Sequence, residues 1–245
     1  MTKPVSIRTV AFASFAGTTI EWYDFFLYGT AAALVFNKVF FPTFAPLTGT
    51  LAAYGTYAVG FVARPLGGVV VVHFGDRIGR KSMLVMTLVV MGAATFLIGL
   101  LPTYDQIGPW AAVALVVLRV VQGFGVGGEW GGAVLMAVEH APAGKRGFYG
   151  SWPQVGVPAG LLLSTIVYFP FSRMPEAAFL SWGWRVPFLL SIVLVMVGLF
   201  IRVRILETPA FERLKETRQR ARLPIFEVVR KYPKEVLLAM GARFA

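Results

Sequence analysis

Several charged side chains stand inside long apolar stretches of the sequence, and two carboxylates and one guanidinium among them could do chemistry together. Glu21 and Asp24 lie in an apolar run from about 10 to 36, and Arg119 lies in another from about 109 to 139. The i, i+3 spacing puts the two carboxylates on one helix face, and a charge near the middle of a membrane costs about 2.5–3.5 kcal/mol. We interpret these groups as lining one concave polar face, where carboxylates carry protons and arginine holds an anionic solute. The alternative is a buried Asp–Arg pair that only locks two helices together.

Two further polar residues join these candidates. Glu129 lies deeper than the loop that follows its apolar run and is a second candidate proton carrier. Gln154 lies between Pro153 and Pro158, which are expected to interrupt the fifth apolar run. Such breaks are tolerated where neighbouring helices or cavity water satisfy the freed backbone groups. Gln154 is therefore a candidate donor to a solute, and a simple kink with a satisfied amide is the alternative.

Glycine recurs every four residues at Gly123, Gly127 and Gly131, and again at Gly156 and Gly160. A face of small residues at this spacing lets another helix approach closely inside a membrane. We predict that the fourth and fifth helices pack against each other through these glycines. The same faces also suit an interface that slides during a conformational change, and the sequence leaves both interpretations open.

The composition explains why these residues must be placed by membrane helices. Of the 245 residues, 57% are hydrophobic and 14% are charged, whereas soluble domains average about 45–50% apolar and about 25% charged residues. The mean hydropathy is +0.70. An ordinary soluble domain and a disordered chain are both excluded. A spanning helix needs about 20 apolar residues, and six runs qualify: 10–36, 50–73, 82–101, 109–139, 149–171 and 186–203. We predict an all-α membrane protein built as a bundle of six transmembrane helices.

The positive charges predict how this bundle is oriented. The net charge is +11, but the basic residues sit in the gaps between apolar runs rather than in a patch that suits nucleic acid. Seventeen of the 23 Lys and Arg fall at the N-terminus, in the second and fourth loops or after the sixth run, and three fall in the opposite loops. Loops rich in Lys and Arg stay cytoplasmic. We expect a multi-pass protein of the inner membrane with both ends in the cytoplasm.

The chain divides into three expected parts. Residues 1–203 form the transmembrane domain, 204–235 a basic cytoplasmic linker, and 236–245 the truncated start of a seventh helix. The linker forms either an amphipathic helix on the membrane surface or a solvated connection. The sequence has no cysteine, and His73 and His140 lack ligands at suitable spacing, so we expect no metal site. We expect no cofactor beyond protons as the coupling ion.

Three short motifs together resemble the major facilitator superfamily. One lies between the second and third runs, one in the fourth run and one in the loop after it: Asp76-Arg77-x-Gly79-Arg80-Lys81, Arg119-x-x-Gln122-Gly123 and Glu139-x-x-Pro142-x-x-x-Arg146-Gly147. Four other segments resemble the metabolite:proton symporter family within it, which carries shikimate, α-ketoglutarate, citrate, proline and betaine: residues 21–25, 64–68, 127–132 and 181–185. The resemblance runs along nearly the whole chain.

The resemblance implies a fold of twelve helices in two halves, of which this chain matches the N-terminal half. Each half is a 3+3 inverted repeat, and the solute binds between the halves at mid-membrane. The resemblance makes Asp24 a coupling or site residue and Arg119 a contact of the solute or of the proton network, with Gln122 as a further candidate. It also implies a cytoplasmic gating network of charged loop residues: Asp76, Arg77, Arg80, Glu139 and Arg146.

These observations favour a secondary transporter over two alternatives. The proposed activity is proton-coupled symport of a small organic acid or zwitterionic compatible solute by alternating access, with the lipid bilayer and a missing C-terminal half as partners. A membrane enzyme is not expected, because no paired catalytic set appears in the sequence. The remaining alternative is a truncated, transport-inactive scaffold, or a half that needs its partner half.

Overall fold

A computed structural model describes residues 6–203 and 230–244 of the chain. The described part is built from helices and contains no strand. Its elements, in chain order, are α1 (Ile7–Ala31), η1 (Ala32–Phe36), α2 (Asn37–Val39), α3 (Pro46–Ile78), α4 (Arg80–Leu100), α5 (Tyr104–Ile107), α6 (Trp110–Val126), α7 (Glu129–His140), α8 (Arg146–Gly150), α9 (Trp152–Ser172), α10 (Glu176–Ala178), η2 (Phe179–Gly183), α11 (Arg185–Val203) and α14 (Pro233–Phe244).

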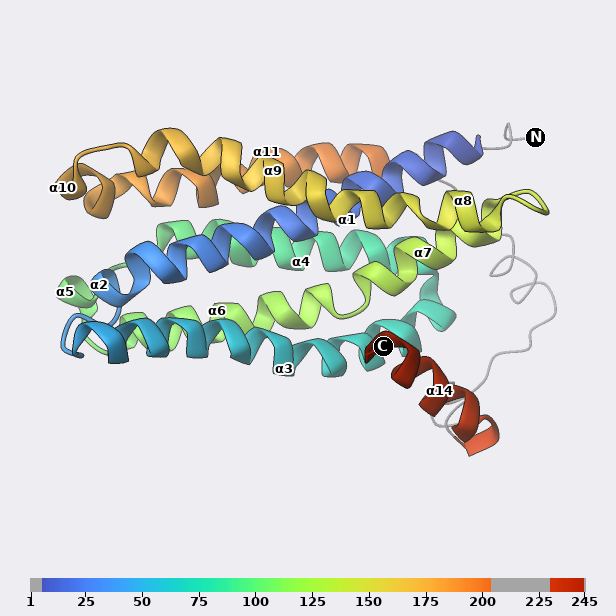
Figure 1. Ribbon diagram of the computed structural model, residues 1–245, viewed down its shortest axis with the longest axis horizontal. Coiled ribbons are helices and arrows are strands. Elements are labelled where there is room, and N and C mark those ends of the chain that lie inside the picture. Colours follow the sequence, from blue (N-terminus) through green and yellow to red (C-terminus); the bar gives the residue numbers. More distant parts are fainter. Residues whose placement is uncertain (1–5, 204–229, 245) are drawn as a thin grey trace.

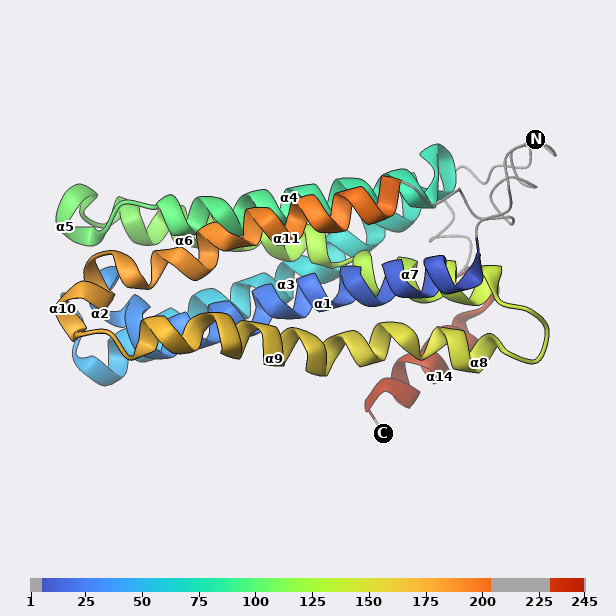
Figure 2. The ribbon, with the colours of Figure 1, turned by 90° about the horizontal axis from the view of Figure 1, so that it is seen from above.

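The long helices lie side by side along one axis (Figure 1, Figure 2). Four stretches of the described chain are long and apolar enough to cross a membrane: Lys81–Leu100, Trp110–His140, Arg146–Ser172 and Glu176–Ile201. α1 and α3 have 25 and 33 residues, so at 1.5 Å per residue each is longer than the roughly 30 Å of hydrocarbon. With these two, the bundle has the six long helices that the sequence predicts.

The connections alternate between the two ends of the bundle. The α3–α4 turn and the α7–α8 loop lie at the end where the chain begins, and α2, α5 and α10 lie at the opposite end (Figure 1). We call these the N-terminal end and the far end. The α3–α4 turn is sharp because Gly79 adopts a φ of 112°, which other residues rarely reach. The two basic loops that the sequence places on one side are therefore at one end.

Glycines bring the helices together in pairs that differ from the predicted pair. A Cβ on Gly123 would strike the backbone of Gly60, so α6 packs against α3. A Cβ on Gly156 would come within 2.9 Å of the Phe15 carbonyl oxygen, so α9 packs against α1. The predicted packing of the fourth helix against the fifth through these faces is wrong, and a Cβ on Gly131 would meet no described residue of another helix within 4 Å. Sequence spacing identifies a close-packing face but not the helix that it meets.

The interruptions also differ from the prediction. α9 continues through Pro158, while Pro153 stands in its first turn, where a missing N–H costs nothing. The expected interruption of the fifth helix by these prolines is therefore wrong. The fourth helix is broken instead, because α6 ends at Val126 and α7 begins at Glu129, with two glycines between them.

The far end holds the largest aromatic core. Trp184 is fully buried and meets Phe36, Phe40 and Phe188 edge to face, with ring centroids 5.9 Å apart in the first two pairs and 6.0 Å apart in the third. Arg185 beside it donates from Nη1 to the carbonyl oxygens of Gly99 and Leu101 at 2.9 and 2.6 Å. It therefore satisfies carbonyls at the C-terminus of α4, which gives this pair of residues a structural role.

The segment after α11 is only partly described. α14 begins three residues before the predicted start of a seventh helix. Residues 204–229 lie outside the described residues, so the linker and the three-part division stay predictions.

Candidate functional site

Asp24 and Arg119 come together inside the bundle, and Gln122 connects them. Asp24 accepts hydrogen bonds from the Thr95 hydroxyl and from Nε2 of Gln122, and Oε1 of Gln122 accepts one from Nη1 of Arg119. Gln122 Nε2 also donates to Thr95 Oγ1 at 2.9 Å. The three helices α1, α4 and α6 thus meet at one network, which we call the Asp24 cluster: Asp24, Thr95, Arg119 and Gln122.

The Asp24 cluster is closed to solvent. Asp24 and Arg119 are each 3% exposed, and Gln122 is fully buried. The prediction that both charges line a concave face is therefore wrong, although neither points at lipid. The i, i+3 relation of Arg119 and Gln122 on α6 explains the geometry, because it stacks the amide one turn from the guanidinium. Burial makes this network stronger and also more costly to leave incomplete.

Arg119 is held by aromatic rings as well as by Gln122. Its guanidinium carbon lies 4.1 Å from the ring centroid of Tyr28 and 4.8 Å from that of Tyr57, a geometry typical of cation–π attraction. The Tyr28 hydroxyl shares a hydrogen bond of 2.6 Å with Thr56. A Cβ on Gly60 would come within 2.7 Å of Arg119 Nε. Glycine at this position of α3 therefore makes the space that the guanidinium occupies.

Two further carboxylates are buried in the same bundle. Glu129 is 1% exposed, begins α7 and accepts a hydrogen bond of 3.0 Å from the Thr87 hydroxyl. Glu21 is 4% exposed and lies one turn from Asp24 on α1. Thr87 precedes Thr95 by eight residues on α4, which corresponds to about 12 Å along the helix. The Glu129 and Asp24 sites therefore share α4 as a frame.

Gln154 does not join either site. It stands in the first turn of α9, near the N-terminal end, and its side chain is exposed. The structure therefore separates it from the Asp24 cluster. Its assignment as a donor to the solute stays a prediction.

The predicted gating residues gather at the N-terminal end. Asp76 and Arg77 lie in the last turn of α3, Arg80 begins α4, Glu139 lies in the last turn of α7 and Arg146 begins α8. The side chains of Asp76, Arg77 and Arg80 lie outside the described residues. The predicted approach of Arg77 or Arg80 to Glu139 therefore stays a prediction.

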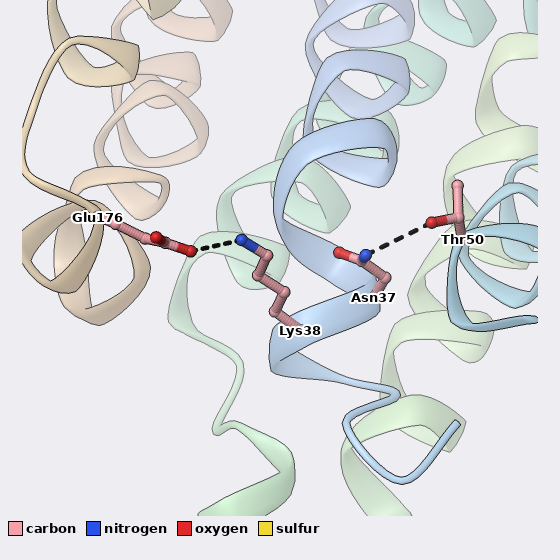
Figure 3. A network of polar contacts seen from close by, with 4 residues as sticks. All are labelled: Asn37, Lys38, Thr50 and Glu176. Carbon is pink, nitrogen blue, oxygen red and sulfur yellow. Dashed lines mark hydrogen bonds and ion pairs between the residues drawn. The ribbon is translucent and has the colours of Figure 1, made fainter. Parts of the chain in front are cut away.

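The far end carries a polar link that the sequence analysis did not single out. Lys38 donates from Nζ to Glu176 at 2.5 Å, and Asn37 donates from Nδ2 to Thr50 Oγ1 at 3.4 Å (Figure 3). Lys38 and Glu176 are 49% and 69% exposed, so solvent screens the pair and it contributes little to stability. The two hydrogen bonds connect the end of the first helix to the start of α3 and to α10. The sequence did offer a signal for this pair, because Lys38 and Glu176 carry opposite charges and follow the first and fifth apolar runs, which end on the same side.

The sequence is similar to a known family and to several characterised proteins. The model of the "Sugar (and other) transporter" family matches residues 9–235. The Shikimate transporter of Escherichia coli (strain K12) is 52% identical over 96% of this chain and 55% of its own length. The Proline/betaine transporter of the same strain is 37% identical over 98% of this chain and 52% of its own length. The chain thus spans about half the length of the curated relatives it matches.

A solved structure shares the fold. The proton:xylose symporter XylE of the major facilitator superfamily, bound to 6-bromo-6-deoxy-D-glucose, superposes with a TM-score of 0.76 at 19% identity. The match covers 85% of this chain and 46% of XylE. At this identity the likeness shows the fold alone.

Proposed function

Because the chain belongs to the sugar (and other) transporter family, within the major facilitator superfamily, we propose that it forms the N-terminal half of a proton-coupled secondary transporter. The second half completes the twelve-helix fold, and a small organic acid or zwitterionic solute is carried between the halves. Both ends of this half face the cytoplasm, as the distribution of Lys and Arg indicates. The membrane is the inner membrane of a bacterial cell.

The observation that carries this proposal is the Asp24 cluster. A buried carboxylate and a buried guanidinium meet through one amide, and together they connect α1, α4 and α6. A proton on Asp24 removes the charge that offsets Arg119 and turns one carboxylate oxygen into a donor. The hydrogen bonds then have to rearrange, and the helices that carry them shift in relative stability. Protonation thereby biases one conformation over another, which is the requirement for coupling.

Arg119 has the means to rearrange. Its Nε is buried without a hydrogen-bond partner among the described residues. The rings of Tyr28 and Tyr57 stabilise the cation without fixing the direction of its N–H groups. Loss of the Asp24 charge therefore leaves Arg119 with donors that a second state can use.

The N-terminal end supplies the proposed gate. Asp76, Arg77, Arg80, Glu139 and Arg146 lie in loops at that one end, and interfacial pairs of this kind are worth about 0–1 kcal/mol each. That is too little to hold the fold, but enough to bias two conformations that differ by a few kcal/mol. Asp76 is expected to find its contact in the second half.

Proton-driven accumulation in proteoliposomes tests the proposal. The protein used is the full-length transporter, meaning this chain joined to the second half that its relatives carry. Asp24→Asn should abolish accumulation driven by a pH gradient, by at least about 100-fold, while exchange of labelled solute between the two sides persists. The matched control is Asp105→Asn, since Asp105 is an exposed carboxylate of α5 at the far end. Unchanged accumulation in Asp24→Asn would refute the coupling role.

An uptake measurement on this chain without the second half tests the alternative that the chain is inactive alone. It covers about half of its relatives, so a transport-inactive half that needs its partner is the second candidate. Proteoliposomes with this chain alone should show no uptake, and co-reconstitution with the second half should restore it. Uptake by the chain alone would contradict the need for a partner half.

A further inference from the structure

Arg64 is a second arginine inside the bundle, and its surroundings differ from those of Arg119. It lies in the interior of α3, one turn after Gly60, and therefore about 6 Å along the helix from the residue that packs on Arg119. Its side chain is half-buried. The guanidinium carbon lies 4.7 Å from the ring centroid of Phe61 and 5.2 Å from that of Phe25.

Arg64 is a cation without a polar partner in the described part of the chain. The rings of Phe25 and Phe61 are its direct contacts there, and the Asp24 carboxylate is close enough to interact with it electrostatically, but no described residue gives it a hydrogen bond or a close ion pair. An arginine within a membrane span is costly unless it faces a cavity and finds an anion or carbonyl groups. The rings offset part of that cost but leave the N–H edge of the guanidinium unused. That N–H edge is therefore open to an anion from outside the described residues.

The surface around Arg64 is aromatic and partly open. The rings of Phe25, Tyr57 and Phe61 meet one another with centroids 5.0–5.5 Å apart: 5.0 Å for Phe25 and Tyr57, 5.5 Å for Phe25 and Phe61, and 5.4 Å for Tyr57 and Phe61. Trp22 continues the row, 4.9 Å from Phe25. Phe61 is 42% exposed. We call Phe25, Tyr57 and Phe61 the aromatic shelf.

The shelf and the guanidinium together suit one class of solute. Arginine stacked on a ring presents a planar fork of donors, which matches the two oxygens of a carboxylate. The ring faces beside it can cover an apolar body of the same molecule. In folds of this kind, solutes bind near the bilayer midplane at the interface between repeats, and Arg64 lies near the middle of the long helix α3 with its side chain half-buried.

We propose that Arg64 binds the carboxylate group of the transported solute, and that the aromatic shelf packs against the solute's body. This assignment rests on the proposed transport function and names a substrate class for it. It also separates the two arginines. Arg119 is 3% exposed behind Gly60 and holds the Asp24 cluster, whereas Arg64 is the arginine that a solute can reach.

Pairs of an acid and its monomethyl ester, which differ by one negative charge and one methyl group, test this assignment. Uptake and thermal stabilisation by shikimate, 2-oxoglutarate and citrate are compared with their monomethyl esters, using the full-length transporter. Wild type should prefer at least one free acid by 10-fold or more. Arg64→Gln should abolish that preference, and Arg64→Lys should retain part of it, because lysine keeps the charge but loses the planar fork.

The matched control is Arg173→Gln. Arg173 also lies over a ring, 4.3 Å from the centroid of Phe169, but it is exposed at the far end. This variant should keep the preference for the acid unchanged. Detergent-solubilised yield and gel-filtration profile confirm that each variant folds.

Three results would overturn the assignment. One is a preference for the acid that survives Arg64→Gln. Another is an equal loss of uptake for acid and ester, which would mean that Arg64 pairs with a carboxylate of the second half. The third is uptake of labelled proline or xylose by wild type with no acid transported or bound. That last result would leave the proposed transport function standing, whereas wild type without uptake of any probe would refute both.

Discussion

Two buried carboxylates share α4 as a frame but are held in different ways. Asp24, from α1, is bound by side chains of α4 and α6, and a guanidinium stands behind one of them. Glu129 opens α7 and accepts from Thr87 of α4. Its carboxylate lies at a helix N-terminus, where the free N–H groups and the helix dipole favour negative charge.

The difference shows why burial alone does not identify a coupling residue. The environment of Asp24 depends on three helices keeping their places, so its charge and their arrangement are coupled. The helix end that favours the charge of Glu129 belongs to the residue's own helix and moves with it. We therefore assign proton coupling to Asp24 first. Glu129 stays a second candidate for proton coupling. We expect its main role to be structural, at the break between α6 and α7.

Gln122→Leu should give the largest effect on stability that either site allows. The amide is the shared partner of Asp24 and Arg119, and its loss leaves two buried charges without their bridge. Breaking a buried charged network of this kind costs about 3 kcal/mol or more. Thermal unfolding in detergent, followed by tryptophan fluorescence, should show a marked drop in Tm. The control is Gln154→Leu, on an exposed position of α9, and an equal drop in both variants would contradict the bridging role.

The sequence predicts the fold far better than the site. Run lengths and charges are local properties, so the six helices and the common end of the basic loops follow from them. Which helices pack against each other is not determined by the local sequence of either one. The glycines of α6 meet Gly60 of α3 and those of α9 meet α1, and nothing in their spacing selects these partners. The resemblance to a known family points to Asp24, Arg119 and Gln122, but not to the hydroxyl that joins them.

Thr95 and Thr87 are the residues that the sequence analysis missed. Both stand in the apolar run predicted as the third helix, where a threonine commonly donates its hydroxyl proton to a carbonyl of the preceding turn. Here the hydroxyls of Thr87 and Thr95 lie 3.1 and 2.9 Å from such carbonyl oxygens and share their single proton with the two carboxylates. Threonines that bond in this way are common in membrane helices, so they do not stand out in the sequence as candidate site residues. Their spacing of eight residues was the available signal, because it places both hydroxyls within one stripe of the helix, which can face the interior of the bundle.

Glu129→Gln should have an intermediate effect and sharpen the contrast between the two carboxylates. The neutral amide keeps the size of the side chain and still accepts from Thr87, while the favourable interaction of the charge with the helix dipole, up to about 2 kcal/mol in buried geometries, is lost. Proton-driven accumulation by the full-length transporter should fall by less than about 10-fold. A loss as complete as that expected for Asp24→Asn would make Glu129 an equal member of the proton path and remove the ranking.

The smallest effects should come from replacing the two threonines. Which replacement lowers the stability more tests how differently Asp24 and Glu129 are held. Hydrogen bonds between membrane helices average about 0.6 kcal/mol and reach about 1.7 kcal/mol. Thr95 donates to Asp24 and accepts from Gln122, so Thr95→Val removes two contacts and should cost about 1.5 kcal/mol. Thr87→Val removes the contact with Glu129 and should cost about 0.6 kcal/mol. Valine keeps the branched shape in both variants, so packing changes little, and the paired unfolding measurements isolate the hydroxyls. If Thr87→Val proved as costly as Thr95→Val, Glu129 would depend on α4 as strongly as Asp24 does, and its own helix end would not be what holds it.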